Sequence, residues 1–241
     1  MGNRCVKGAS MLEHFDDGEL TTISFSNAPP QPPERRQNLR HVTVLRVAKL
    51  QTPRSEELCL VRNISAGGLM AHIYSELNIG EPVSAEFKSG QAVSGRVLWR
   101  RDGLAGIEFD QPVNAARILA DSHDYSPSAQ QPRAPRVGMD VKARIRVGAR
   151  YHTVTLCNIS QSGGRVSPGD PLEAGEKLIL MLNGLPPIAG SVRWSDREHA
   201  GIAFDNPIAF EALARWVPTM QAQARERQLA SNNGAPDERR V

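Results

Sequence analysis

Short segments in which apolar residues alternate with polar ones, or form brief runs, dominate the chain. Residues 42–47 and 57–61 are rich in strand-forming residue types, residues 93–99 alternate around Gly95, and residues 104–109 form a further run. Such patterns predict β-strands. Turn sequences that contain glycine separate these segments at short intervals. We therefore predict antiparallel hairpins that close into a small barrel.

Helical patterns follow these strands. One covers residues 113–120 and is short, and another covers residues 208–229. Pro218 is expected to interrupt the longer helix, because proline lacks the N–H group that an interior helical residue donates.

A direct repeat divides the chain into two related halves. A shift of 95 residues places the tripeptide Asn-Ile-Ser at 63–65 on that at 158–160, and Gly68 on Gly163. Across residues 94–112, nine of 19 positions are identical after this shift, whereas average residue usage gives roughly one. The repeated unit has the length of a domain rather than that of a solenoid repeat. We therefore predict a mainly all-β protein with two related barrels, each followed by a C-terminal helix.

Polar and proline-rich stretches indicate where the domains begin and end. The expected organisation is a flexible leader over residues 1–33, a first domain over 34–120, a linker over 121–131, a second domain with its helix over 132–230, and a disordered tail over 231–241.

Charge and composition narrow the class of ligand. The chain has 241 residues, 29 basic and 26 acidic side chains, a net charge of +3, and only 5% aromatic residues. This balance does not suit a protein whose main task is to neutralise a long phosphate backbone. The scarcity of aromatic residues also argues against wide stacking platforms for single-stranded nucleic acid.

Motifs for metal binding, catalysis and membrane insertion are absent from the sequence. The three cysteines are widely separated, and the histidines have no metal-ligand spacing. There is no phosphate-binding glycine loop, zinc-protease helix or nucleophile elbow. No apolar run approaches the roughly 20 residues that span a bilayer. We expect a soluble, cytoplasmic, non-enzymatic protein without metal or other cofactor.

Three arginines, Arg35, Arg36 and Arg40, stand just before the first predicted strand. A guanidinium can bind phosphate through two hydrogen bonds, pair with the O6 and N7 atoms of guanine, and stack on a base. These arginines therefore suit an anionic, planar ligand. A solvated basic linker has the same composition, so the run alone leaves both interpretations open.

A second polar motif, formed by Asn63, Ser65 and Gly68, lies where one predicted strand ends and the next begins. The asparagine oxygen can accept hydrogen bonds from the N1–H and N2–H groups of guanine, and the serine hydroxyl can bind phosphate or base. Glycine permits positive φ and lets the backbone approach a ligand closely. A hairpin turn closed by local hydrogen bonds uses the same residue types, so this motif also has two interpretations.

Together, the two motifs resemble the paired signature of the PilZ domain family. Arg36 and Arg40 have the family's arginine spacing, and the Asn-x-Ser-x-x-Gly motif follows some 20 residues later. Residues 95–109 resemble the family's closing strands. The resemblance covers about residues 34–120 and, in the second half, residues 132–217.

The resemblance implies that each barrel has six antiparallel strands and that the first barrel binds the bacterial second messenger cyclic di-GMP. Arg36 and Arg40 are implied to hold guanine and phosphate. Asn63 is implied to read the guanine edge, while Ser65 and the backbone of Gly68 complete the wall of the site.

The second half keeps the barrel part of this signature and loses half of the arginine part. If Arg136 takes the second arginine position, Pro132 takes the first and brings neither charge nor N–H group. Losing one charge-assisted contact weakens binding by about 1.5–3 kcal/mol. We expect the second barrel to be silent or weak as a nucleotide site and to serve as scaffold or partner surface. The candidate residues of a weaker second site are Arg133, Arg136, Asn158, Ser160 and Gly163.

Trp99 and Trp194 occupy equivalent positions on a predicted strand. For both we predict packing within the barrel, with the indole N–H satisfied at one end, rather than stacking on a ligand.

These expectations describe a receptor that changes conformation on binding cyclic di-GMP and relays the signal to an unidentified protein partner in motility, exopolysaccharide or cell-cycle machinery. Arg35 adds a third cation, which suggests an intercalated ligand dimer. One alternative is an adaptor of the same fold that binds no nucleotide. A less favoured alternative is an RNA- or DNA-binding face, for which a solvated surface is the simpler explanation. The basic residues of that face would be Arg133, Arg136, Lys142, Arg144, Arg146 and Arg150.

Overall fold

The computed structural model describes residues 45–88, 90–119 and 134–233. The first half contains β1 (Arg46–Gln51), β2 (Glu56–Ile64), β3 (Gly68–His72), β4 (Pro82–Phe87), β5 (Ala92–Arg101), β6 (Leu104–Phe109) and α1 (Ala115–Leu119). The second half contains β7 (Val137–Val147), β8 (Arg150–Ser160), β9 (Gly163–Pro168), β10 (Lys177–Met181), β11 (Ile188–Ser195), β12 (Ala200–Phe204) and α2 (Phe210–Asn233).

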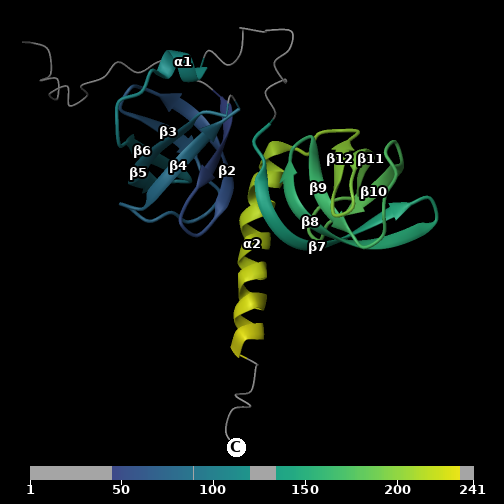
Figure 1. Ribbon diagram of the computed structural model, residues 1–241. Coiled ribbons are helices and arrows are strands. Elements are labelled where there is room, and N and C mark those ends of the chain that lie inside the picture. Colours follow the sequence, from purple (N-terminus) through teal and green to yellow (C-terminus); the bar gives the residue numbers. More distant parts are fainter. Residues whose placement is uncertain (1–44, 89, 120–133, 234–241) are drawn as a thin grey trace, which may run out of the picture. The chain divides into compact units, whose positions relative to one another are not determined.

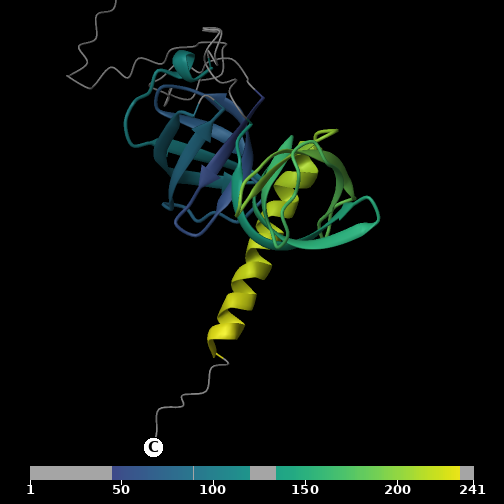
Figure 2. The same ribbon diagram turned by 45° about the vertical axis from the view of Figure 1, so that its right-hand side comes forward.

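Each half forms a closed barrel of six antiparallel strands (Figure 1). In the first barrel the strands follow the order β1-β2-β3-β6-β5-β4, and pairing of β1 with β4 closes the ring. The second barrel repeats this order with β7-β8-β9-β12-β11-β10, and pairing of β10 with β7 closes it. The ring of strands of the second barrel is visible in Figure 2. The predicted fold class is therefore confirmed.

The strands that the sequence predicted are present, with shifted ends. β2 and β5 extend beyond the predicted segments at both ends, whereas β6 covers the predicted residues. β1 starts at Arg46, near the end of the segment predicted over 42–47, and residues 42–44 lie outside the described part. The hydrophobic pattern did not single out β3, β4, β9 and β10, which are short.

Tight turns join neighbouring strands where the sequence has glycine. Between β5 and β6, Asp102 and Gly103 have φ angles of 50° and 73°. Two consecutive residues with positive φ match the right-handed twist of the flanking strands in a two-residue hairpin. Glycine takes this conformation without steric cost, and aspartate tolerates it better than most residues.

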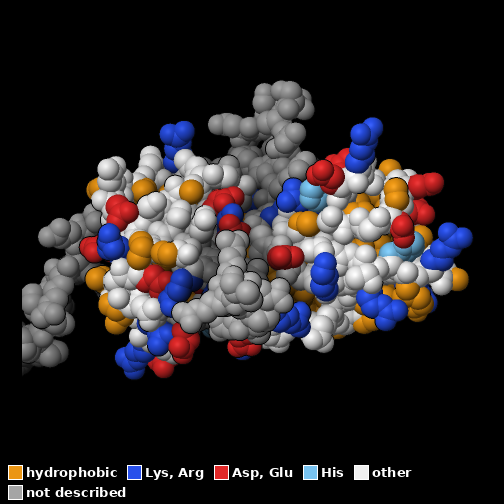
Figure 3. Space-filling model, turned by 60° about the horizontal axis from the view of Figure 1, so that its bottom comes forward, with side chains coloured by type: hydrophobic (Ala, Val, Ile, Leu, Met, Phe, Trp, Pro, Cys, Tyr) orange, Lys and Arg blue, Asp and Glu red, His pale blue; other side chains and the backbone are white. Residues whose placement is uncertain are grey.

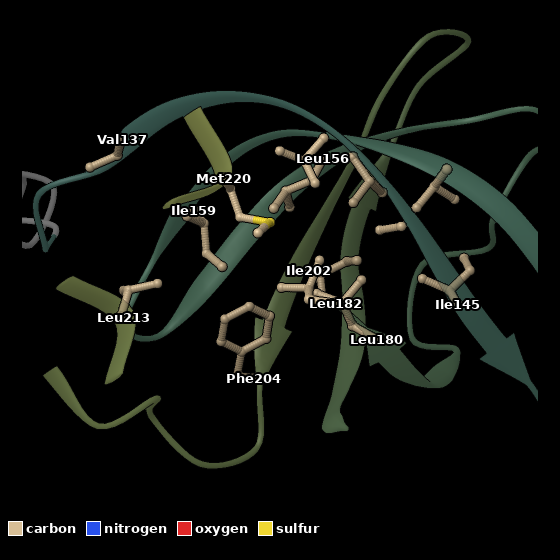
Figure 4. Packing of buried hydrophobic residues seen from close by; sticks show 14 of the residues in the cluster. Val137, Ile145, Leu156, Ile159, Leu180, Leu182, Ile202, Phe204, Leu213 and Met220 are labelled. Atoms are coloured by element: carbon tan, nitrogen blue, oxygen red, sulfur yellow. The ribbon is translucent and has the colours of Figure 1, made fainter. Parts of the chain in front are cut away.

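Alternation along the strands places one side of each in a barrel core. In β7, Val141, Ala143 and Ile145 are buried while the residues between them are exposed. Figure 4 shows Ile202, Phe204 and Leu180 from other strands, together with Leu182 just after β10, converging on the interior of the second barrel. This burial of apolar surface stabilises the closed sheet.

Helix α2 completes the core of the second barrel. Its residues Leu213, Val217 and Met220 are buried in the same cluster as the strands. The helix runs without a break through Pro218 to Asn233, so the predicted interruption is wrong, and the helix enters the stretch predicted as tail. Packing of its apolar face keeps the helix in place although proline removes one backbone hydrogen bond.

In Figures 1 and 2 the later turns of α2 extend past the strands of the second barrel. Within the described residues, no helix is long and apolar enough to cross a membrane.

Candidate functional site

The structure describes the barrel part of the predicted site and not its arginine part. Arg35, Arg36, Arg40 and Arg133 lie outside the described residues. Of the predicted site residues, the structure describes Asn63, Ser65, Gly68, Arg136, Asn158, Ser160 and Gly163.

A β-bulge turns Asn63 to the outside of the first barrel. Along β2, Cys59 and Val61 face the core, and simple alternation would place Asn63 beside them. The register shifts between Val61 and Asn63, so Arg62 is the extra residue and Ile64 faces the core instead. Bulges re-aim side chains in this way and are frequent beside binding sites.

The side-chain amide of Asn63 has no hydrogen-bond partner among the described residues. Asn63 is half-buried, and its directly paired neighbour on β3 is Met70, which also lies on the outer surface. A polar amide held by rigid strands and left without a protein partner can bind the edge of a base.

Ser65 and Gly68 close the turn between β2 and β3. The Ser65 hydroxyl donates to the carbonyl oxygen of Gly68 over 3.2 Å, and the Ser65 N–H donates to the same oxygen over 2.8 Å. Gly68 is not in the positive-φ region. Glycine is needed there because a Cβ would collide with the carbonyl oxygen of Ile107 on β6. Local hydrogen bonds in the turn thus account for Ser65, and the close approach of the β6 backbone accounts for Gly68.

Trp99 lies on the outer surface of the barrel and not in its core, so the predicted packing is wrong. The cause is a second bulge, between Val97 and Trp99, which leaves Val97 buried and turns Trp99 outward. A Cβ added to Gly106 would collide with the indole ring of Trp99. The indole therefore lies directly against β6. Its side chain remains 37% exposed.

Direct strand pairing joins these residues in one line across the barrel surface. Asn63 pairs with Met70, Met70 pairs with Gly106, and Gly106 pairs with Trp99. We call these four residues the first outer row. At one end of the row, the amide of Asn63 has no partner among the described residues and can form hydrogen bonds with a nucleotide base. At the other end, the indole of Trp99 presents an aromatic face that can stack on a base.

The second barrel repeats this line with one substitution. Asn158 pairs with Arg165, Arg165 with Gly201, and Gly201 with Trp194. We call these four residues the second outer row. Bulges before Asn158 and Trp194 again turn both residues outward.

Arg165 stands where the first outer row has Met70. Arg165 is not among the predicted site residues, although the shift of 95 residues aligns it with Met70 and is a signal that points to it.

Ser160 and Gly163 repeat the turn of the first barrel. The Ser160 hydroxyl donates to the carbonyl oxygen of Gly163 over 3.0 Å, and a Cβ on Gly163 would collide with the carbonyl oxygen of Ile202. Arg136 precedes β7 and is exposed.

The basic residues of β7 alternate with core residues and lie on the outer face of the second barrel. Lys142, Arg144 and Arg146 are exposed. Lys142 donates to the Thr155 hydroxyl over 2.9 Å, and the Arg144 guanidinium lies 4.9 Å from the Tyr151 ring centre. Figure 3 shows basic and acidic side chains interspersed over the face that it draws. Such mixing does not create the single-sign field that steers nucleic acid.

Two titratable groups inside the first barrel are buried away from the outer row. Burial raises the pKa of the Cys59 thiol to about 12. Burial also raises the pKa of Glu57. The hydrogen bond from Ser75 lowers this pKa, and the charge of Glu81 raises it further, so the net shift is upward. A thiol with such a pKa is not a nucleophile at neutral pH. The described residues contain no group of three or more side chains suited to hold a metal ion.

Solved structures with similar folds have low sequence identity to this chain. PlzA of Borreliella burgdorferi, in complex with c-di-GMP, is 14% identical, with 73% of this chain and 88% of that chain covered and a TM-score of 0.33. YcgR of Escherichia coli, in complex with c-di-GMP, is 13% identical, with 78% and 88% covered and a TM-score of 0.31. The inhibitor of motility MotI/DgrA of Bacillus subtilis is 16% identical, with 83% and 100% covered and a TM-score of 0.27.

A comparison with curated proteins gave no match. The two closed six-stranded barrels define the class of fold. The family follows from a match to a family model. The model of the PilZ domain matches residues 34–121 and 130–217. The chain belongs to the PilZ domain family, with two tandem copies of the domain.

Proposed function

We propose that this protein is a non-enzymatic receptor that binds cyclic di-GMP on the first barrel. Arg36 and Arg40 bind guanine and phosphate from the segment before β1, and Asn63 accepts hydrogen bonds from a guanine edge. Binding joins that segment to the barrel and changes a surface that a protein partner recognises. A ligand shifts such an equilibrium only through contacts that differ between the two states, and these arginines supply them.

The unpartnered amide of Asn63 carries this proposal. Turning Asn63 outward requires a bulge in β2, and the amide gains no hydrogen bond with a described residue in return. A ligand with N–H donors would supply the missing partner. Ser65 and Gly68 shape the turn beside it, and their contact with the ligand is the secondary part of the proposal.

The remaining parts of the proposal concern location, stoichiometry and the protein partner. A cyclic dinucleotide made inside the cell places the receptor in the cytoplasm. Arg35 provides a third guanidinium, which favours binding of two stacked ligand molecules. The partner belongs to motility, exopolysaccharide or cell-cycle machinery.

Calorimetric titration of the full chain with cyclic di-GMP tests the proposal. We expect binding in the micromolar range and a loss of about 100-fold or more in the Arg36→Ala/Arg40→Ala variant, because charge-assisted hydrogen bonds contribute about 1.5–3 kcal/mol each. GTP and cyclic AMP, titrated in parallel, should bind far more weakly.

Arg150→Ala is the matched control, since Arg150 is an exposed arginine at the start of β8, outside both outer rows. Unchanged affinity in the double variant would show that the arginine assignment is wrong. Absence of binding to the wild-type chain would favour a nucleotide-independent adaptor.

A further inference from the structure

Three cations of β7 form a strip on the outer face of the second barrel. Lys142, Arg144 and Arg146 are exposed and stand at alternate positions, so their side chains share one face of the strand. We call these three residues the basic strip. β7 pairs with β8 on one side and with β10 on the other. Along these three strands the only carboxylate is that of Asp140, near the start of β7, so β8 and β10 bring no acidic partner to the strip.

The first barrel lacks this strip, although its strand pairing is the same. Arg144 pairs with Met181 on β10 in the register in which Lys49 pairs with Glu86 on β4. Together with Tyr151, Ile179 and Met181, the strip has three cations and no carboxylate. The six corresponding positions of the first barrel have one cation and two carboxylates, and are Val47, Lys49, Gln51, Glu56, Ser84 and Glu86. The barrel fold therefore does not require the basic strip.

The contacts within the second barrel leave the charge of the strip in place. Lys142 donates to the Thr155 hydroxyl, and the Arg144 guanidinium lies over the Tyr151 ring. Arg146 makes no hydrogen bond or ion pair with a residue in the described part of the chain. Since none of these contacts involves an anion, a carboxylate from outside the molecule can pair with each of the three cations.

Apolar side chains border the strip on both sides. Tyr151 is 54% exposed and pairs directly with Arg146. On β10, Ile179 and Met181 are half-buried and pair with Arg146 and Arg144. Arginine, tyrosine and methionine are enriched at protein–protein interfaces, where lysine is depleted. A membrane surface attracts lysine and arginine alike, so this composition favours a protein partner.

From these observations we infer that the basic strip binds an extended, acidic segment of a partner protein. Alternate residues of an extended chain repeat about every 6.6 Å, which is also the spacing of the strip residues along β7. Carboxylates at every second position of the partner segment therefore meet the strip in register. The barrel is closed and has no free strand edge, so side chains rather than added strand pairing provide the contact.

This inference names the partner surface that the proposed function leaves open, and its place in a signalling relay rests on that function. Binding of the acidic segment itself needs no cyclic di-GMP. The surface can therefore be tested separately from the receptor site.

NMR titration of the full chain with short peptides, in the absence of cyclic di-GMP, tests the inference. In one peptide glutamate alternates with threonine, and in the other the same glutamates form a single block. We expect the alternating peptide to bind more tightly and to shift the amide resonances of β7 and β8. Arg144→Gln/Arg146→Gln should weaken this binding by about 5- to 30-fold. Arg193→Gln, at an exposed arginine of β11, is the matched control and should leave it unchanged.

A second variant keeps all three cations and neutralises them from within. Tyr151→Glu/Met181→Glu restores the carboxylates that the first barrel has as Glu56 and Glu86, and should weaken binding of the alternating peptide about as much as the arginine variant. Tyr151→Gln/Met181→Gln is its uncharged control and should weaken binding less. Circular dichroism of each variant verifies that the fold is retained.

Several outcomes would overturn the inference. These are equal binding of the two peptides, unchanged binding in the arginine variant, and no binding of the alternating peptide. Tighter binding of phosphatidylserine vesicles or of duplex DNA, lost in the same arginine variant, would also overturn it, because the strip would then serve another class of partner. Peptide binding by a chain that fails to bind cyclic di-GMP in calorimetry would overturn the proposed function alone.

Discussion

The two barrels have the same strands in the same order, yet their surfaces differ. Across the outer rows, asparagine, glycine and tryptophan recur, whereas Met70 is exchanged for Arg165. Neither exchanged residue faces a core, so the fold tolerates either one. Inward residues and bulges thus recur and maintain the barrel, while outward positions differ in charge between the two copies.

A second difference concerns the neutralisation of basic residues. In the first barrel Lys49 lies 2.8 Å from Glu86 and 3.4 Å from Glu56. Burial lowers the pKa of Lys49, but the hydrogen bonds and charges of these two carboxylates outweigh it and raise that pKa. The corresponding Arg144 has Tyr151 and Met181 as neighbours at the equivalent positions. The carboxylates have been lost, and the arginine instead lies over an aromatic ring.

The helices differ most in their contribution to stability. α1 has five residues and buries Ala115 and Ile118, whereas α2 has 24 residues and buries several large side chains. Leu213→Ala should therefore destabilise the second barrel by about 2–5 kcal/mol. Urea denaturation measures this loss. Leu229→Ala, at a site that is 65% exposed, should have little effect. Equal losses in both variants would contradict the assigned role of α2.

The glycines of the outer rows are expected to behave alike in both barrels. Gly106→Ala and Gly201→Ala should each cost about 1–3 kcal/mol, because the new methyl group must displace an indole. Thermal unfolding, together with the tryptophan emission maximum, records both effects. Gly169→Ala is the control, since a Cβ there meets nothing within 4 Å. A loss in one barrel alone would show that the two rows are not equivalent.

The smallest expected effect concerns a buried carboxyl. Glu57 in the first barrel corresponds to His152 in the second, which lies 3.3 Å from Asp170. Since the folded state raises the pKa of Glu57, the folded state binds the proton more tightly. Stability is therefore lost as pH rises from the unfolded value of about 4.5 through the higher folded pKa.

Glu57→Gln should remove this dependence and stabilise the protein by on the order of 1 kcal/mol at pH 8, with no gain near pH 4. Melting temperatures of wild type and variant at both pH values provide the test. Glu108→Gln, on the exposed side of β6, should show no such dependence. A gain of equal size at both pH values would contradict a shifted pKa as its cause.

The sequence by itself determined the duplication, the barrel class and the family motifs. Alternation and turn residues such as Asp102-Gly103 act over a few positions, so their effects can be read along the chain. In a regular strand, Val97 and Trp99 would share a face because they are two residues apart, and such alternation would agree with the packing within the barrel that we predicted for Trp99.

Only the tertiary structure decided which side chains meet. One-residue bulges after Val61 and Val97 reverse the faces of Asn63 and Trp99, and a bulge has no fixed sequence signal of its own. The placement of Asn158, Arg165 and Trp194 in one row likewise depends on pairing between strands, and β9 and β12 are far apart in the chain. Hydrophobic alternation and turns specify the register of neighbouring strands in a hairpin, whereas closure of the barrel links the tilt and stagger of all six strands and is not written in any one segment.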